Sequence, residues 1–238
     1  MSKESIKKLG KSTWISLLFL MVIIPVTLMI SWKMGDRRYY LCSVLMIFYA
    51  MIPFFLKFEK KKPQPRELVT LAVMCAIAVA SRVAFIAIPS FKPMIGILII
   101  TGMAFGPESG FLAGALTALI SNFIFGQGPW TPWQMFAYGL AGFLSGIVKQ
   151  KGILKAEERI PLAVYGGLLV LVLVGPLLDT SSVFNMNSVI TWEGASAIYL
   201  AGLPLNAVHA GATILTLLIL GKPLNDILER IKRKYGLN

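Results

Sequence analysis

The stretch GQGPWTPW at residues 126–133 lies between two strongly apolar segments, and it decides how the rest of the chain is interpreted. Glycine and proline end a helix on either side of it, whereas Trp130 and Trp133 carry amphipathic rings of the kind found at membrane–water boundaries. We therefore expect a turn that joins two membrane helices and places a tryptophan rim at one face of the membrane.

The wider stretch 91–146 is threaded with small residues, which allow helix backbones to approach closely in lipid. They are Gly96, Gly102, Gly106, Gly110, Ala113, Gly114, Ala115 and Ala118. This pattern predicts a tightly packed helical bundle in the middle of the chain.

Composition indicates an all-α integral membrane protein. Of the 238 residues, 56% are hydrophobic and 14% are charged, and the mean hydropathy is +0.74, too apolar for one soluble core. The net charge of +12 comes from residues between and beyond the apolar segments. It therefore indicates contact with lipid head groups and a defined membrane orientation, and no nucleic-acid partner.

The chain has no P-loop and no metal-spaced Cys/His cluster, which excludes a self-contained ATP-driven pump.

Eight apolar segments are long enough, or nearly so, to cross the membrane. A basic linker, Lys57–Arg66, separates an N-terminal two-span extension (1–66) from a six-helix membrane domain (67–238). The predicted spans are Trp14–Trp32, Tyr39–Leu56, Leu68–Ile88, Met94–Phe105, Ser109–Phe125, Gln134–Val148, Pro161–Leu178 and Ala195–Leu220.

The segment Met94–Phe105 is short, because about twelve residues cover only about 18 Å of a hydrocarbon core of about 30 Å. If it crosses, the basic clusters at 3–11, 57–66, 149–159 and 222–234 all lie on one side. The positive-inside rule therefore favours eight spans with both termini in the cytoplasm. Three loops then face outward, namely Pro89–Pro93, Gly126–Pro132 and Asp179–Gly194, and the last is long, polar and free of Lys and Arg.

Polar and aromatic residues on the outer halves of the helices and in these loops are the candidate binding residues. Arg82 is either a membrane-surface anchor, which we favour, or a binding-site cation. His209 is expected to form a structural hydrogen bond or to contact a ligand, since metal ligation needs further donors. The predicted substrate-binding set is Arg82, Asn122, Gln127, Trp130, Trp133, Gln134, Asn185, Trp192, Asn206 and His209.

Four alanines, at positions 72, 76, 80 and 84, form a continuous stripe along the first helix of the six-helix domain. A small-residue stripe of this kind is a groove for another helix, either within the bundle or on a partner protein.

Several local motifs resemble the substrate-binding S-component of energy-coupling factor (ECF) vitamin transporters, in particular the variant assigned to cobalamin. They are RELV at 66–69, FKP at 91–93, FGPESG at 105–110, SNF at 121–123 and GQGPWTPWQ at 126–134. The resemblance covers about residues 67–220, and the two N-terminal spans depart from its six-helix pattern.

The resemblance implies a non-enzymatic plasma-membrane protein without catalytic residues or resident cofactor. It would capture a vitamin from outside and dock on a transmembrane coupling subunit (the T component) with two cytoplasmic ATPases. In that family an alanine-rich face contacts the coupling subunit, which carries over here to Ala72, Ala76 and Ala80. The S-component is thought to topple in the bilayer and deliver its ligand inward.

The residues alone limit the ligand only loosely. Few external cations argue against a polyanion, and tryptophan with amide side chains suits a large planar molecule such as cobalamin. Riboflavin, a queuosine precursor and pantothenate stay open as ligands. An ion-coupled secondary transporter would need carboxylates inside spans, and every acid is expected at a loop, tail or helix end. A membrane enzyme would need a convergent catalytic set, for which one histidine is poor support.

Overall fold

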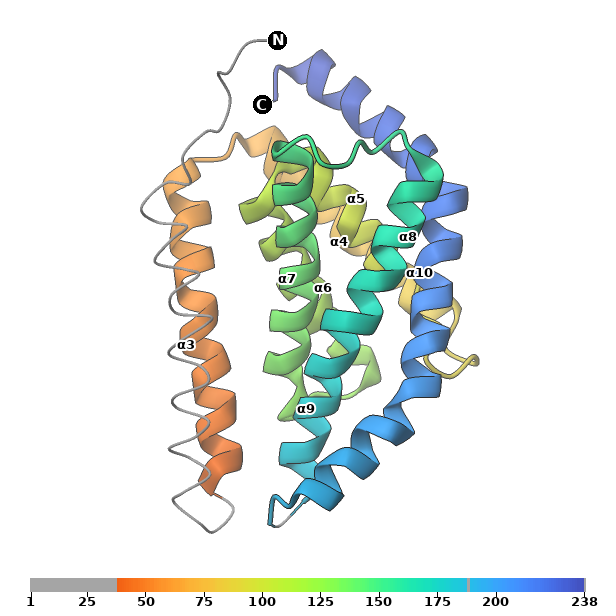
Figure 1. Ribbon diagram of the computed structural model, residues 1–238. Coiled ribbons are helices and arrows are strands. Elements are labelled where there is room, and N and C mark those ends of the chain that lie inside the picture. Colours follow the sequence, from red (N-terminus) through yellow and green to blue (C-terminus); the bar gives the residue numbers. More distant parts are fainter. Residues whose placement is uncertain (1–37, 188, 238) are drawn as a thin grey trace.

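The computed structural model describes residues 38–187 and 189–237, and their regular secondary structure is helical throughout (Figure 1). This confirms the all-α prediction for the described part of the chain. In order, the helices are α3 (Arg38–Lys61), α4 (Pro65–Ala84), α5 (Met94–Phe105), α6 (Pro107–Phe125), α7 (Trp130–Gln150), α8 (Arg159–Leu169), a π-helical turn (Val170–Val174), α9 (Gly175–Met186) and α10 (Trp192–Tyr235).

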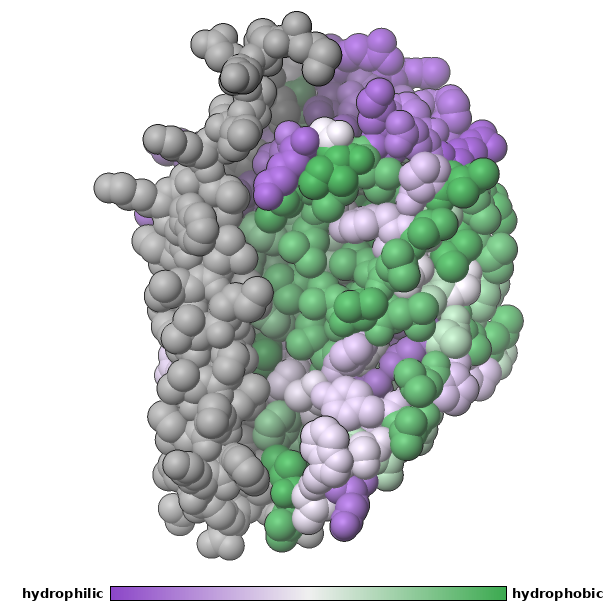
Figure 2. All heavy atoms as spheres, in the orientation of Figure 1, coloured by the Kyte–Doolittle hydropathy of each residue, from purple (hydrophilic) through white to green (hydrophobic). Residues whose placement is uncertain are grey.

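Because α8, the π turn and α9 follow one another without a break, the described residues form seven continuous helical rods. Four of these rods are long and apolar enough to cross a membrane: α4, α6, the α8–α9 rod and α10. Figure 2 shows a broad apolar belt across the molecule and a hydrophilic region at the end where α10 finishes. The chain is thus a multi-pass membrane protein.

The two-plus-six arrangement is only partly visible. The predicted span Trp14–Trp32 lies outside the described residues, whereas Tyr39–Leu56 lies within α3. The predicted linker Lys57–Arg66 is largely helical, since α3 continues through Lys61 and α4 begins at Pro65. Lys57 lies in α3, and its ammonium group pairs with Glu108 at the start of α6.

The short helix α5 lies at the centre of the bundle, and all twelve of its residues are buried. Its last turn lies beside the end of α10, where Lys232 Nζ donates to the Ala104 carbonyl at 2.8 Å. The start of α6 is held nearby by a hydrogen bond of 2.9 Å from Ser109 to Glu67 of α4. Helix α5 therefore carries the chain back from the end of α4 to the start of α6. A helix this short is tolerated because protein rather than lipid surrounds it.

Glycines bring α5, α6 and α7 into backbone contact. A Cβ atom on Gly102 or on Gly110 would overlap the carbonyl oxygen of Gly142, and one on Gly146 would overlap the backbone of Pro107. The tight bundle predicted from the small residues is confirmed here, with glycine required because no larger residue leaves room for the facing backbone.

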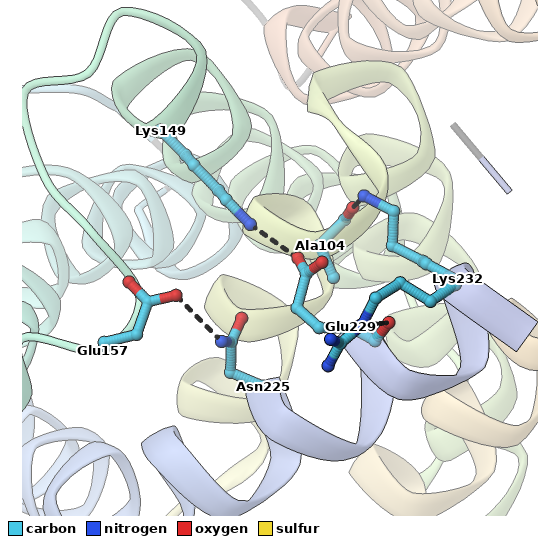
Figure 3. Close-up of polar contacts among 7 residues, drawn as sticks. Ala104, Lys149, Glu157, Asn225, Glu229 and Lys232 are labelled. Carbon is cyan, nitrogen blue, oxygen red and sulfur yellow. Dashed lines mark hydrogen bonds and ion pairs between the residues drawn. The ribbon is translucent and has the colours of Figure 1, made fainter.

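One end of the bundle is closed by a set of contacts that we call the polar cap (Figure 3). Lys149 of α7 donates to Glu229 of α10 at 3.0 Å, and Asn225 donates to Glu157 at 3.5 Å. Together with Lys232, which reaches the end of α5, these contacts hold the last turns of α10 across the ends of α5 and α7.

Helix α3 packs on α6 and α7. The Phe54 ring stacks on Phe111 with a centroid distance of 4.0 Å, and it meets Phe143 edge-on at 4.9 Å. This position leaves the outer face of α4 uncovered by α3.

Candidate functional site

A polar pocket of about 610 Å³ lies at the end of the bundle opposite the polar cap. It is formed where the loop before α5, the first turns of α7, the end of α9 and the N-terminal half of α10 meet. The residues that line it are Ser90, Lys92, Trp130, Gln134, Leu178, Asp179, Ser181, Ser182, Asn185, Met186, Leu205, Asn206 and His209.

One wall of the pocket is helical where the sequence predicted a loop. The prediction of a loop from Asp179 to Gly194 is wrong at both ends, because α9 continues to Met186 and α10 begins at Trp192. The hydroxyl groups of Thr180 and Ser182 donate to the carbonyl oxygens four residues earlier, at 2.7 and 3.2 Å. Such bonds keep polar residues inside a helix, so the polar composition misled the prediction.

Asp179 is therefore a carboxylate inside a membrane rod. Its Oδ2 accepts a 2.7 Å hydrogen bond from Asn206 of α10. Glycines make room for this pair, since a Cβ on Gly202 would crowd Asp179 and one on Gly175 would crowd Asn206. The expectation that every acid lies at a loop, tail or helix end is wrong for Asp179, so that reasoning alone does not exclude a secondary transporter.

His209 lies deep in the pocket, with 2% of its surface exposed. Its ring meets Tyr138 edge-on at a centroid distance of 6.5 Å. The Nε2 atom is buried and forms no hydrogen bond within the described part of the chain. A buried nitrogen without a partner is costly, which makes it a candidate contact for a ligand.

The loop before α5 contributes a cation, Lys92, to the pocket lining. Ser90 has a positive φ of 58°, a conformation that is uncommon for residues other than glycine. The turn is held by Phe91, whose ring packs on Phe85 with a centroid distance of 4.9 Å. It places Ser90 and Lys92 in the pocket lining. Neither residue was in the predicted substrate-binding set, although Lys92 belongs to the FKP motif at 91–93.

Arg82 does not snorkel to the membrane surface. It is only 7% exposed, and its guanidinium lies 4.2 Å from the centroid of the Phe125 ring. It donates hydrogen bonds to Ser121 Oγ and to Asn122 Oδ1 of α6. Arg82 is thus part of a buried network behind the pocket.

The ten predicted binding residues fall into three groups. Five line the pocket, namely Trp130, Gln134, Asn185, Asn206 and His209. Arg82, Asn122 and Gln127 belong to the hydrogen-bond network behind it. Trp133 is buried and stacks on Phe184 at 5.8 Å, while Trp192 is 87% exposed at the start of α10 and lies outside the pocket lining.

A second depression, which we call the alanine groove, runs along the outer face of α4 beside α6. It has a volume of about 670 Å³. Its lining is Ala72, Cys75, Ala76, Val79, Ala80, Val83, Ala84, Leu116, Ile120 and Ile124, so it is apolar and includes the whole predicted stripe. The four stripe alanines are exposed, which places the stripe outside the packed bundle.

Comparison with known proteins agrees with this architecture. Residues 62–226, more than half of the chain, match the family model described as "ECF-type riboflavin transporter, S component". The chain is also similar to the UPF0397 protein VS_II0189 of Vibrio atlanticus (strain LGP32), with 24% identity over 179 residues that cover 72% of this chain and 96% of that protein. No solved structure matches the chain significantly. The chain therefore belongs to the family of S components of ECF-type transporters.

Proposed function

We propose that this S component captures cobalamin in the polar pocket and delivers it to the cell interior. The observation that carries the proposal is the gathering of Trp130, Gln134, Asn185, Asn206 and His209 around one pocket. An aromatic ring with several amide side chains suits a large planar solute whose rim carries amides. The motifs around residues 105–110 and 126–134, which resemble the cobalamin type, support the same choice.

The charges of the pocket also suit a solute without a large net charge. Lys92 and Asp179 contribute opposite charges, so the lining offers no cluster of cations for a polyanion. The volume of about 610 Å³ lies within the usual range of ligand pockets, roughly 300 to 1,000 Å³.

Riboflavin is the second candidate, because the matching family model is described by that vitamin. It is also planar and bears carbonyl and imide groups that the amide side chains could bind.

The alanine groove is the proposed docking surface for the coupling subunit. Membership of the family implies association with a T component and ATPases, and the groove is an exposed apolar channel along a helix, into which a partner helix could pack closely. Basic clusters at 57–66, 149–159 and 222–234 lie at the polar-cap end, so the positive-inside rule supports a cytoplasmic cap and an external pocket.

Calorimetric titration of the detergent-purified chain against cobalamin and riboflavin, without any partner, tests the solute assignment. Saturable binding of cobalamin with weaker or no binding of riboflavin is the expected result. Preference for riboflavin would replace cobalamin with the second candidate. ATPase-independent uptake into proteoliposomes would overturn the coupled mechanism.

A further inference from the structure

One residue, Arg82, fixes which groups donate and which accept in the hydrogen-bond network behind the pocket. A guanidinium group can only donate hydrogen bonds. Arg82 therefore faces the carbonyl oxygen of the Asn122 amide, at 2.9 Å, and the amide nitrogen of Asn122 must point the other way. Arg82 is buried and lies against Phe125, so it is held in this position.

The amide nitrogen of Asn122 then donates to two acceptors. It bonds to Thr131 Oγ1 at 3.0 Å and to Gln134 Oε1 at 2.9 Å. The Thr131 hydroxyl in turn donates to Gln127 Oε1 at 2.9 Å. Gln127 Nε2 donates to the Leu119 carbonyl oxygen at 2.9 Å, where this branch ends. Every bond in both branches runs away from Arg82.

The branch through Gln134 ends at the pocket. Its oxygen is occupied by Asn122, and Gln134 lines the pocket. No hydrogen bond to its Nε2 is found among the residues that the structure describes. The side chain is half-buried, and this nitrogen is the hydrogen-bond donor that the amide can still offer to a solute.

We propose that Arg82 and Asn122 are positioning residues that lock the Gln134 amide with its NH2 group toward the solute. Gln134 is then a fixed hydrogen-bond donor that selects an acceptor oxygen, such as an amide or ring carbonyl. This inference rests on the proposed function only in requiring that a solute enters the pocket. A free glutamine could turn either its oxygen or its nitrogen toward a solute, whereas the bond from Asn122 holds the Gln134 oxygen away and leaves the NH2 group facing the pocket.

Asn122→Asp is the critical variant, because it keeps the shape of the side chain and replaces the donor NH2 group by an acceptor oxygen. A carboxylate accepts from Arg82 but cannot donate to Gln134 Oε1. The Gln134 amide is then expected to turn, donate its NH2 group to Asp and present its oxygen to the pocket. Ser121→Ala is the matched control, since it removes another partner of Arg82 without breaking the link to Gln134.

The first measurement needs no ligand. If only glutamine is labelled with ¹⁵N, four labelled side-chain amides are present, those of Gln64, Gln127, Gln134 and Gln150. The variant Gln134→Met then identifies the resonance of the Gln134 amide, because that resonance disappears. In the native chain and in Ser121→Ala we expect the Gln134 NH2 protons to exchange rapidly with water. In Asn122→Asp their exchange should slow by about 10-fold as they gain a buried acceptor. Slow exchange in the native chain, or equal exchange in all variants, overturns the assigned polarity.

The second measurement is calorimetric binding of cobalamin and riboflavin. Asn122→Asp and Gln134→Glu should each weaken the solute that binds the native chain by about 10-fold or more, because an acceptor then faces an acceptor. Ser121→Ala leaves the bond from Asn122 to Gln134 in place, so this variant should retain binding within about 3-fold. Native affinity in Asn122→Asp or Gln134→Glu would overturn the donor role.

The two readouts separate this inference from the proposed function. If the native chain binds neither solute, the solute assignment fails while proton exchange still decides the polarity of Gln134. If Asn122→Asp does not yield folded protein, Gln134→Glu decides the donor role by binding.

Discussion

Trp130 and Trp133 are three residues apart in the first turn of α7, yet they have opposite environments. Trp130 is 42% exposed and lines the pocket, whereas Trp133 is 2% exposed and stacks on Phe184 of α9. The sequence marked both as rim residues because composition does not reveal which side of a helix start faces a neighbouring helix. The two rings are therefore expected to differ in function.

Trp130→Ala should weaken solute binding by about 1 to 3 kcal/mol, because the ring loses its apolar contact with the solute. Its effect on thermal stability in detergent should be small, since the ring is exposed. Calorimetry and a thermal melt of the same preparation measure both quantities. Unchanged affinity would return Trp130 to the role of an interfacial anchor.

Trp133→Ala should act on the fold. Removing a buried tryptophan leaves a cavity between α7 and α9, which costs about 3 to 5 kcal/mol of folding free energy. The thermal melt should shift strongly downward. A variant that melts like the native chain but binds no solute would show that Trp133 is a direct contact.

Arg82 shows how much the sequence could reveal about a single residue. An arginine in an apolar helix predicted either an anchor or a buried cation, and only three-dimensional proximity to Ser121, Asn122 and Phe125 distinguishes them. These partners are about 40 positions away in sequence, and no local pattern connects them to Arg82. The general choice of polar residues was informative, but the division into lining and supporting residues depends on contacts between helices.

At the scale of elements, hydropathy predicted the helices well and their ends poorly. The segments 94–105 and 109–125 agree closely with α5 and α6 because glycine and proline bound them. The end of α9 was missed because its hydroxyl and amide side chains bond to their own helix, a possibility that polarity alone conceals. From this segment the predicted site took Asn185 and Trp192, and it did not include Asp179, Ser181 and Ser182, which line the pocket.

The alanine groove on α4 allows a test of docking. Replacing Ala76 and Ala80 together by leucine should fill the groove and block assembly with the coupling module and uptake, while solute binding stays nearly native. Val73→Leu on the same helix is the control, since Val73 is exposed but does not line the groove. Co-purification with the module, uptake and calorimetry give the three readouts. Normal uptake by the double variant would remove the groove from the docking surface.

The contact between α6 and α7 at Gly142 is expected to tolerate no side chain. Gly142→Ala places a Cβ against the backbone of Gly110, and separating the two helices should cost about 1 to 3 kcal/mol of stability. Gly211→Ala is the matched control, because nothing lies within 4 Å of the added atom. That change should be neutral or stabilising by up to about 1 kcal/mol. Equal melting of the two variants would show that the contact is loose.

At the scale of the whole molecule, the polar cap and the pocket lie at opposite ends, which makes membrane orientation testable. In a background without Cys42 and Cys75, Met186→Cys marks the pocket end and Lys151→Cys marks the cap end, and both positions are exposed. An impermeant maleimide should label Met186→Cys on intact cells and Lys151→Cys only in inverted vesicles. The reverse pattern would place the pocket in the cytoplasm.

The glycine contacts among α5, α6 and α7 have a mechanical consequence. Backbones that already touch cannot slide closer, and the facing carbonyl groups resist rotation of one helix against the next. These three helices should therefore move together as one rigid unit. A force that reached these helices through α4, which packs on α5 and α6, would then move the three together rather than slide one past another.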